Sequence, residues 1–444
     1  MAGGAPGVKA PSPSAAGTAM VPLVVGLFFV WGFITVLNDP LVAKLKGLFA
    51  LDYTEAMLTQ FAFFLGYFVF SVPAGFVLNR FGYVRSIALG LAIMAIGCLG
   101  FAPAAMSGFF GGFLVALFCV AAGITLLQVA ANPFIAALGS SATAPSRLTL
   151  AQAFNSLGTF IGPFVGALFL LQNGVGAPAA GASPAARIAE AELVQRPFLA
   201  IAGVLLLLAI VFWLRRGAPV PPTDSQDINP FSRRLLGRPR LMLGVLSIFL
   251  YVGAEVSIGS GLINYLLQPT VIGGQAASLG AAAARGLHAL FGGRYAFNVA
   301  QIAGVMVSLY WGLAMLGRFA GSAVLARVSP GKVLAGNALA AIALALLSAM
   351  TGGAVAAGSI LAIGLANSIM FPTIFALALD GLEEETANGS ALLCMAIVGG
   401  AIVPLAYGAM ADRFGLSLAL LVPVACYALI AGYGAFAART SVSE

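Results

Sequence analysis

Charged residues are scarce in this chain. Of its 444 residues, 21 are Lys or Arg and 14 are Asp or Glu, or 8% of the total, whereas a soluble domain carries about 25%. Hydrophobic residues make up 61% of the sequence. This composition excludes a water-soluble globular protein. It also excludes a nucleic-acid-binding protein, because the net charge of +7 is small and lies mostly in loops on one side.

The chain also lacks the residues that build metal centres and disulfide frameworks. Its one histidine, His288, falls in an expected loop, and its four cysteines lie in apolar runs without a CxxC pair. We therefore expect no metal-dependent or His-based catalysis, no bound cofactor, and cysteines that behave as small hydrophobic residues. Residues 1–20 lack the apolar core of a cleavable signal, and we expect them to form a disordered cytoplasmic tail.

Long apolar stretches are what the chain has in abundance. About 20 apolar residues span a bilayer, and 444 residues allow twelve spans. Bounded by Pro, Gly or charge, the expected helices cover residues 21–48, 54–79, 84–103, 109–138, 147–172, 197–214, 241–267, 299–326, 332–351, 355–378, 388–410 and 415–437. The sequence therefore predicts an all-α membrane protein with twelve transmembrane helices.

A polar segment divides these helices into two sets of six. Residues 215–240 contain six arginines and are rich in proline, which is typical of a linker. We expect an N-terminal six-helix bundle at 21–214, a cytoplasmic linker at 215–240 and a C-terminal six-helix bundle at 241–438. With the N-terminus placed inside, thirteen Lys or Arg fall in inside segments and seven in outside loops. The positive-inside rule thus places both termini in the cytoplasm.

The two halves repeat each other. Val77-Leu78-Asn79-Arg80 matches Val324-Leu325-Ala326-Arg327 at an offset of 247 residues. Asn132-Pro133-Phe134-Ile135 matches Phe371-Pro372-Thr373-Ile374 at 239, and the Gly158/Pro163 pair matches Gly399/Pro404 at 241. Two pseudo-symmetric bundles with a site between them are the architecture of an alternating-access carrier.

Three charged residues are candidates for a position near the bilayer centre, where a charge costs about 2.5–3.5 kcal/mol on insertion scales. Asp39 precedes Pro40, with Thr35 one helical turn earlier. Its carboxyl group is a candidate to bind a proton or a cation; the alternative is an ion pair with Lys44 or Lys46. Glu255 lies four residues from Tyr251, a pair that suits a polyol ligand or, equally, a gate.

The third charged residue, Arg318, lies nine residues before the inside end of its helix. We favour a structural role over substrate contact, because its side chain can extend to the cytoplasmic face.

Uncharged amides and aromatic rings complete the interior. Amides donate and accept hydrogen bonds, and an indole covers the apolar face of a sugar ring, so this chemistry suits a neutral sugar. A phosphorylated or carboxylated substrate would call for several intramembrane basic residues. Any one of these amides could equally form a hydrogen bond that joins two helices. Beside Tyr251 and Glu255, the candidate sugar ligands are Gln128, Asn132, Gln152, Asn155, Asn264, Trp311 and Asn367.

Five segments resemble the fucose–galactose–glucose symporter family of the major facilitator superfamily. They are residues 28–39 (FFVWGFITVLND), 128–134 (QVAANPF), 147–156 (RLTLAQAFNS), 251–255 (YVGAE) and 371–375 (FPTIF). The match runs from about residue 24 to the C-terminus and is nearest to the bacterial glucose/galactose branch. The resemblance implies a multi-pass carrier in the bacterial inner membrane with a sugar site in a central cavity.

The resemblance also implies where coupling occurs. In the fucose branch, an aspartate at the position of Asp39 and a glutamate in helix 4 handle a proton, but the helix-4 position here is Gln128. An amide takes up no proton, so a relay of those two carboxylates is broken. Asp39 alone could carry the proton, or Asp39, Asn38, Thr35 and Gln128 could ligate Na⁺, which we slightly favour. Asn79 also stands where the superfamily's loop motif usually has an acid, beside Arg80 and Arg85; with Arg318 and Arg327 these are the candidate gating or structural residues.

The leading hypothesis is therefore cation-coupled uptake of a neutral hexose, glucose or galactose, by a monomer in the lipid bilayer. A proton-coupled carrier of fucose or another deoxysugar is the alternative within the class. A membrane-embedded glycosyl or phosphate transferase is a remote alternative, since it would need clustered acids, histidine or a metal site.

Overall fold

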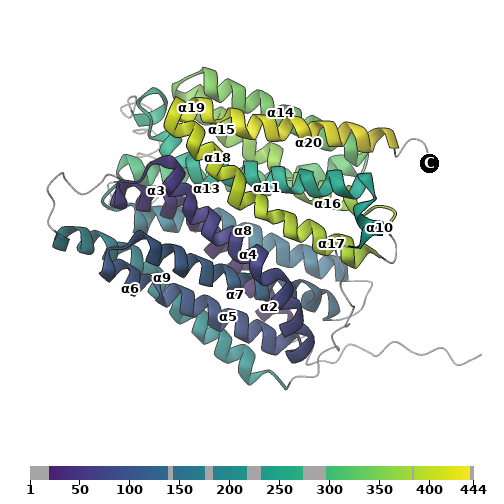
Figure 1. The fold of residues 1–444 in the computed structure, drawn as a ribbon, viewed down its shortest axis with the longest axis horizontal. Coiled ribbons are helices and arrows are strands. Elements are labelled where there is room, and N and C mark those ends of the chain that lie inside the picture. The colour runs from purple at the N-terminus through teal and green to yellow at the C-terminus, as the bar shows by residue number, and fades with distance from the viewer. Residues whose placement is uncertain are drawn as a thin grey trace, which may run out of the picture.

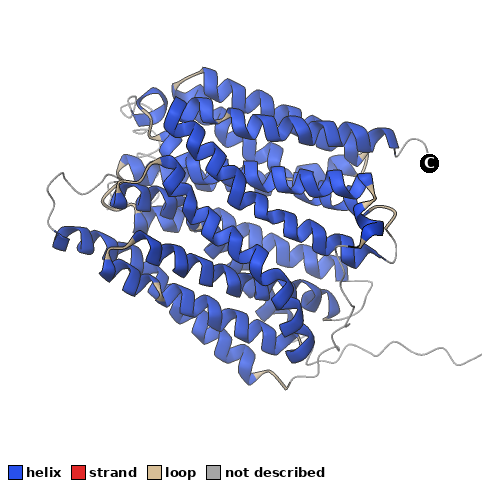
Figure 2. Ribbon diagram, in the orientation of Figure 1, coloured by secondary structure: helices blue, strands red, loops and turns tan. Residues whose placement is uncertain are grey.

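The protein is helical throughout the part that the structure describes (Figure 2). The computed structural model describes residues 20–138, 144–175, 184–217, 232–273, 297–382 and 385–440. Within these ranges, twelve helices are long and apolar enough to cross a membrane, and there is no strand. The predicted fold class is confirmed. His288, most of the linker and nearly all of the N-terminal tail lie outside the described residues.

The first six spans contain eight helices. They are α2 (Val21–Val36), α3 (Asn38–Phe49), α4 (Tyr53–Phe81), α5 (Tyr83–Leu99), α6 (Phe101–Ser107), α7 (Phe110–Ala137), α8 (Ala144–Leu170) and α9 (Pro184–Leu214). In Figure 1 they form the purple to blue-green lower part of the molecule.

The last six spans form the upper part, in green to yellow, joined through the short helix α10 (Arg233–Leu236). Their elements are α11 (Pro239–Leu266), the π-turn η2 (Pro269–Gly273), α13 (Val299–Leu325), α14 (Pro330–Met350), α15 (Gly353–Asn367), α16 (Met370–Leu379), α17 (Thr386–Met395), the 3-10 turn η4 (Ala396–Val398), α18 (Gly399–Phe414), α19 (Leu416–Ala419) and α20 (Leu421–Thr440).

Most expected boundaries agree with these bounds to within a few residues, and the largest difference is at the start of the sixth span. That span was expected to begin at Pro197, yet α9 begins at Pro184 and contains Pro197. Pro73, Pro133 and Pro163 lie inside helices, within the spans expected for them. Neighbouring helices in a membrane protein can stabilise a helix across the backbone hydrogen bond that a proline removes, so Pro197 does not end the helix.

Helix breaks occur where the sequence predicted continuous spans. The first span is interrupted at Leu37, between α2 and α3, and the tenth at Ser368 and Ile369, between α15 and α16. The break at Leu37 directly precedes Asn38 and Asp39, so it places the carboxylate in the first turn of α3.

Matching glycines set the closest helix contacts in both bundles. Gly158 of α8 packs against the backbone carbonyl of Phe29 in α2, and Gly399 of α18 packs against that of Phe249 in α11. The fifth span thus meets the first in one bundle as the eleventh meets the seventh in the other. These are the same glycines that the repeat paired at an offset of 241 residues.

The cysteines are less uniform than expected. Cys98 and Cys426 are buried and Cys119 is half-buried, but Cys394 is exposed.

We expect Gly158→Ala and Gly399→Ala each to destabilise the protein by about 1–3 kcal/mol, because a Cβ would push the two backbones apart. Gly432→Ala is the matched control, since a Cβ at Gly432 meets nothing within 4 Å. Thermal unfolding of the detergent-solubilised variants measures the difference. Equal midpoints for Gly399→Ala and Gly432→Ala would contradict the packing role.

Candidate functional site

A polar cavity of about 230 Å³ lies between the two bundles. Both bundles contribute to it, through α2, α3, α4, α7 and α8 on one side and α11, α13, α16 and η4 on the other. Its lining includes two carboxylates, three amides and two indoles as well as a ring of aromatic and small residues: Trp31, Gly32, Thr35, Val36, Asp39, Gln60, Phe63, Phe64, Tyr67, Gln128, Asn155, Thr159, Val252, Glu255, Val256, Trp311, Phe371 and Ile397.

Asp39 belongs to the first bundle but is held by the second. Its side chain is buried, and Oδ2 accepts a hydrogen bond from the indole Nε1 of Trp311 at 3.0 Å. A Cβ at Gly259 of α11 would lie 3.3 Å from both carboxylate oxygens. A buried carboxylate needs such a donor, because its transfer from water is costly.

Neither nearby lysine pairs with Asp39, so the ion-pair alternative is wrong. The Nζ of Lys44 lies 2.8 Å from Oε2 of Glu190 on α9, and that of Lys46 lies 4.2 Å from the centre of the Tyr53 ring. Both cations are engaged elsewhere, which leaves the Asp39 carboxylate to the cavity.

Glu255 lies in the same cavity and is linked to Asp39 through a chain of polar groups. The Tyr251 hydroxyl donates to Oε1 of Glu255 at 2.6 Å and lies 3.1 Å from the carbonyl oxygen of Asn367. The Nδ2 of Asn367 donates to the Tyr310 hydroxyl at 2.9 Å. Tyr310 is adjacent to Trp311, whose indole binds Asp39. Hydrogen bonds thus link Glu255 to Tyr310, and a ring contact between Tyr310 and Trp311 completes the route to Asp39.

The amides divide into two groups. Gln128 and Asn155 line the cavity, and Asn155 also donates to the carbonyl of Phe28 at 3.0 Å, so it joins α8 to α2. Asn367 does not line the cavity, but the Tyr251 hydroxyl, which binds Glu255, also donates to its backbone carbonyl oxygen. The structure places the other proposed site residues outside the cavity lining: Asn38, Asn132, Gln152 and Asn264.

Arg318 does not extend to the helix end. Its Nη1 donates to the hydroxyl of Ser156 on α8 at 2.8 Å, so it joins the two bundles near the middle of the molecule. This contact agrees with a structural role.

Two polar residues of α4, the second span, were not predicted from the sequence. Gln60 donates through Nε2 to the Ser260 hydroxyl at 2.7 Å, and the Tyr67 hydroxyl is a hydrogen-bond partner of Trp31 and Thr35. They are seven residues apart on α4 and therefore share a face. The sequence signal that could have identified them is an amide in the middle of a span, followed seven residues later by a tyrosine.

Cross-bundle contacts close one end of the molecule, the end where α4 begins and α18 ends. The Asp412 carboxylate of α18 accepts from the backbone N–H groups of Tyr53 and Thr54 at 2.7 and 2.9 Å and from the Thr54 hydroxyl at 2.6 Å. At the same end, Nδ2 of Asn298 lies 2.8 Å from the carbonyl oxygens of both Leu171 and Gln172. The sequence did not predict either contact.

The predicted gating residues Asn79, Arg80, Arg85 and Arg327 are exposed and lie toward the opposite end, where α4 and α13 finish. The bonds seen there join residues of one bundle, as in the pair of Arg240 with Asp380 at 2.7 Å.

Residues 20–404 match the sequence profile of the Major Facilitator Superfamily. The chain belongs to this superfamily. The "Glucose/galactose transporter" of Brucella abortus is 46% identical over 418 residues, which are 93% of each chain. The "L-fucose-proton symporter" of Escherichia coli is 33% identical over 437 residues, 95% of this chain and 93% of the relative.

The solved structures agree. The crystal structure of the E. coli fucose:proton symporter FucP in its outward conformation is 32% identical and covers 95% of this chain and 99% of its own, with a TM-score of 0.65. The resemblance to the fucose–galactose–glucose symporters is therefore confirmed. These superfamily relatives are named as transporters and not as enzymes, and the chain is a multi-pass membrane protein of the same kind.

Cysteine labelling tests the cavity. In a background with the four native cysteines replaced by alanine, we expect a water-soluble thiol reagent to modify Val256→Cys, which lines the cavity, but not Ser257→Cys, which is fully buried on the next residue of α11. Both substitutions preserve side-chain size. Equal labelling of the two would mean that this face of α11 does not border an aqueous cavity.

Proposed function

We propose that the chain takes up a neutral hexose, glucose or galactose, together with a cation, by alternating access. The observation that carries the proposal is the cavity between the bundles in which Asp39 and Glu255 lie with amides and two indoles. Among the arginines and lysines that the structure describes, none lines this cavity, which disfavours an anionic substrate. The names of the Brucella relatives support the choice of sugar.

The candidate sugar ligands follow from the lining. Gln128, Asn155 and Glu255 would bind hydroxyl groups, and Trp31 and Trp311 would cover the apolar face of the ring. Tyr251 and Asn367 would position Glu255 from behind. Asn132, Gln152 and Asn264 lie outside the lining and are therefore not included among the ligands proposed from it.

Asp39 is the proposed coupling site. Because it accepts its hydrogen bond from Trp311 across the bundle interface, a proton or cation that neutralises its carboxylate would weaken a contact between the bundles. Thr35 and Gln128 line the same cavity and would supply further oxygens to Na⁺, the cation that we favour. Asn38 lies outside the lining and would need to turn inward to join them.

A proton-coupled fucose or deoxysugar symporter is the second candidate. Gln128 removes one carboxylate of the fucose-branch relay, but Glu255 brings a second carboxylate into the cavity from the other bundle. The names of the E. coli relative and of its solved structure support proton coupling.

Uptake of labelled glucose into proteoliposomes, with Na⁺ and pH gradients imposed separately, tests the function. Accumulation driven by the Na⁺ gradient alone is expected. Accumulation only under the pH gradient would assign H⁺, and uptake of fucose but not glucose would overturn the substrate.

The same assay tests the coupling residue. Asp39→Asn should abolish accumulation while exchange of labelled for unlabelled sugar continues, because binding and rocking need no titratable group. Glu255→Gln should weaken apparent sugar affinity about tenfold, as expected for a lost hydrogen bond to a charged group. Glu192→Gln, a carboxylate outside the cavity, is the control. Gradient-driven accumulation by Asp39→Asn would remove Asp39 from the coupling role.

The location follows from the loop charges. With both termini in the cytoplasm of a bacterial cell, the end closed by Asp412 and Asn298 faces the outside of the inner membrane. The structure would then correspond to a state that is closed to the outside, in a carrier that acts as a monomer.

Asp412 and Asn79 are the proposed gate residues of the two ends. α4 ends in Asn79-Arg80-Phe81-Gly82 and α18 in Asp412-Arg413-Phe414-Gly415. Gly82 and Gly415 adopt nearly the same conformation, with φ of 76° and 85° and ψ of 175° and 162°. Each glycine N–H donates at 2.8 Å to the carbonyl four residues earlier. The two helix ends thus have the same conformation, but only one carries a carboxylate.

The difference in charge gives the gates different strengths. Asp412 binds the first N–H groups of α4, where a negative charge is stabilised by unpaired amides and by the helix dipole. Asn79 is exposed and has no hydrogen-bond partner in the described part of the chain. We propose that Asn79 meets the start of α17 in the opposite state, where a neutral amide would hold the contact more weakly.

We expect Asp412→Asn to raise the labelling rate of Val256→Cys from the outside of sealed vesicles about fivefold, since a lost helix cap costs about 1 kcal/mol. Asn79→Asp should act in the same direction, by stabilising the outward-open state. Arg413→Gln, which alters charge at the same helix end, is the control. An unchanged labelling rate in Asp412→Asn would contradict a gating role for this contact.

A further inference from the structure

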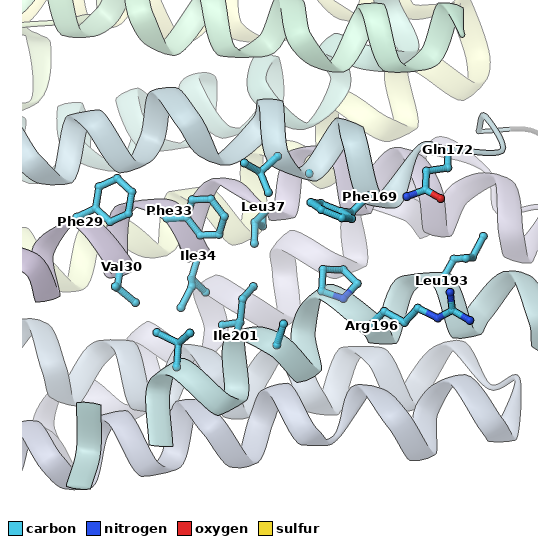
Figure 3. Close-up of a pocket in the computed structure, with 15 residues that line it drawn as sticks. Phe29, Val30, Phe33, Ile34, Leu37, Phe169, Gln172, Leu193, Arg196 and Ile201 are labelled. Atoms are coloured by element: carbon cyan, nitrogen blue, oxygen red, sulfur yellow. The ribbon is translucent and has the colours of Figure 1, made fainter. Parts of the chain in front are cut away.

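A large apolar cavity lies behind the coupling helix, away from the proposed sugar site (Figure 3). It has a volume of about 560 Å³ and is bounded by α2 and α8 on one side and by α9 on the other. Its wall on the side of α2 is formed by Phe29, Val30, Phe33 and Ile34, with Leu37 directly after the helix, whereas Trp31, Thr35 and Val36 of the same helix line the central cavity. One helix therefore forms a wall of both.

The second bundle is packed differently at the equivalent place. There α11 packs along α20, whereas α2 and α9, their counterparts in the first bundle, make little direct contact. In both bundles the last span packs on the third, α9 on α5 and α20 on α14, so the difference lies between the first and last spans. In the first bundle this space is the apolar cavity, and because an empty space of this size forfeits packing energy, we expect an apolar occupant behind α2.

The lining is that of a site for an amphipathic chain. Thirteen of its fifteen residues are nonpolar in the sense of carrying no side-chain N or O, and the two that are polar, Gln172 and Arg196, lie together at one end. From Arg196 to Val204, the groove follows α9 for about 12 Å, close to the half-thickness of the hydrocarbon core, about 15 Å. Val204 is half exposed, so the cavity opens on the side of the molecule where α9 meets the membrane.

Arg196 supplies the charge that identifies the occupant. Its guanidinium group is exposed and has no partner in the part of the chain that the structure describes. It stands near the start of the membrane-spanning part of α9, which begins at Glu190. A guanidinium group at this depth matches the phosphate of a phospholipid, which it can bind through paired N–H donors.

We propose that a phospholipid occupies this groove, with one acyl chain between α2 and α9 and its phosphate on Arg196. The lipid would support the helix that carries Thr35 on its opposite face and that ends at Leu37, next to Asp39. The proposal concerns a lipid site and does not depend on which sugar or cation the carrier moves.

Photolabelling in nanodiscs tests the proposal. The probe is phosphatidylglycerol with a diazirine in one acyl chain, and the matched probe is a diacylglycerol with the same chain and no phosphate. We expect phosphatidylglycerol to label peptides containing residues 29–37 and 196–204, and Arg196→Gln to reduce this labelling about fivefold, the effect of one basic residue at the membrane surface. Arg439→Gln removes an exposed arginine elsewhere and should leave the labelling unchanged.

A second variant tests occupancy without touching the charge. Ala200→Trp, or Val204→Phe if the first does not express, fills the groove from α9 and should abolish labelling of residues 29–37 by both probes. Labelling that persists in the filled variants would overturn the proposal. Equal labelling by diacylglycerol and phosphatidylglycerol, unaffected by Arg196→Gln, would overturn it as well, because the groove would then take any acyl chain without recognising phosphate.

Discussion

A buried carboxylate between two helical bundles is the constraint on which the rest of this structure depends. Asp39 lies far from bulk water, and its donor, Trp311, comes from the other bundle. The free energy of burying that charge is therefore linked to the relative position of the bundles. A change in what Asp39 binds changes how well the bundles fit, which is the physical requirement for coupling an ion to a conformational change.

The internal repeat explains the scaffold, and the departures from it lie where the function is proposed. Gly158 and Gly399, which the repeat pairs, make equivalent contacts in the two bundles. Against this background, three differences stand out: Asp412 opposite Asn79, Glu255 without a matching carboxylate at the end of a network, and a groove behind α2 where α11 has a packed neighbour. The repeat would give the outward-open and inward-open states similar free energies, and these differences would make the two free energies unequal.

In the proposed site, most of the groups that would contact the sugar are neutral, and the charged Asp39 lies at the interface between the two bundles. Gln128 and Asn155 offer donors and acceptors without a net charge, which suits a polyol that must both bind and leave. Glu255 is fixed by Tyr251, and its network reaches Trp311 through Asn367 and Tyr310. We propose that a ligand which displaces a member of this set also shifts Trp311, and so alters the hydrogen bond that Asp39 accepts.

The sequence by itself determined the twelve spans, the repeat and the family, and it selected Asp39, Glu255, Gln128 and Trp311, which the structure places in one cavity. It could do so because apolar length, repeated motifs and rare intramembrane charges are local properties of a chain. Only the tertiary structure decided which amides face the cavity, that Lys44 pairs with Glu190 and not with Asp39, and that Arg318 binds Ser156. It also revealed Gln60, Tyr67 and Asp412, whose partners lie as many as 359 residues away in the chain. Helical periodicity gives the face of a side chain relative to its own helix, but the neighbour on that face depends on how twelve helices pack together.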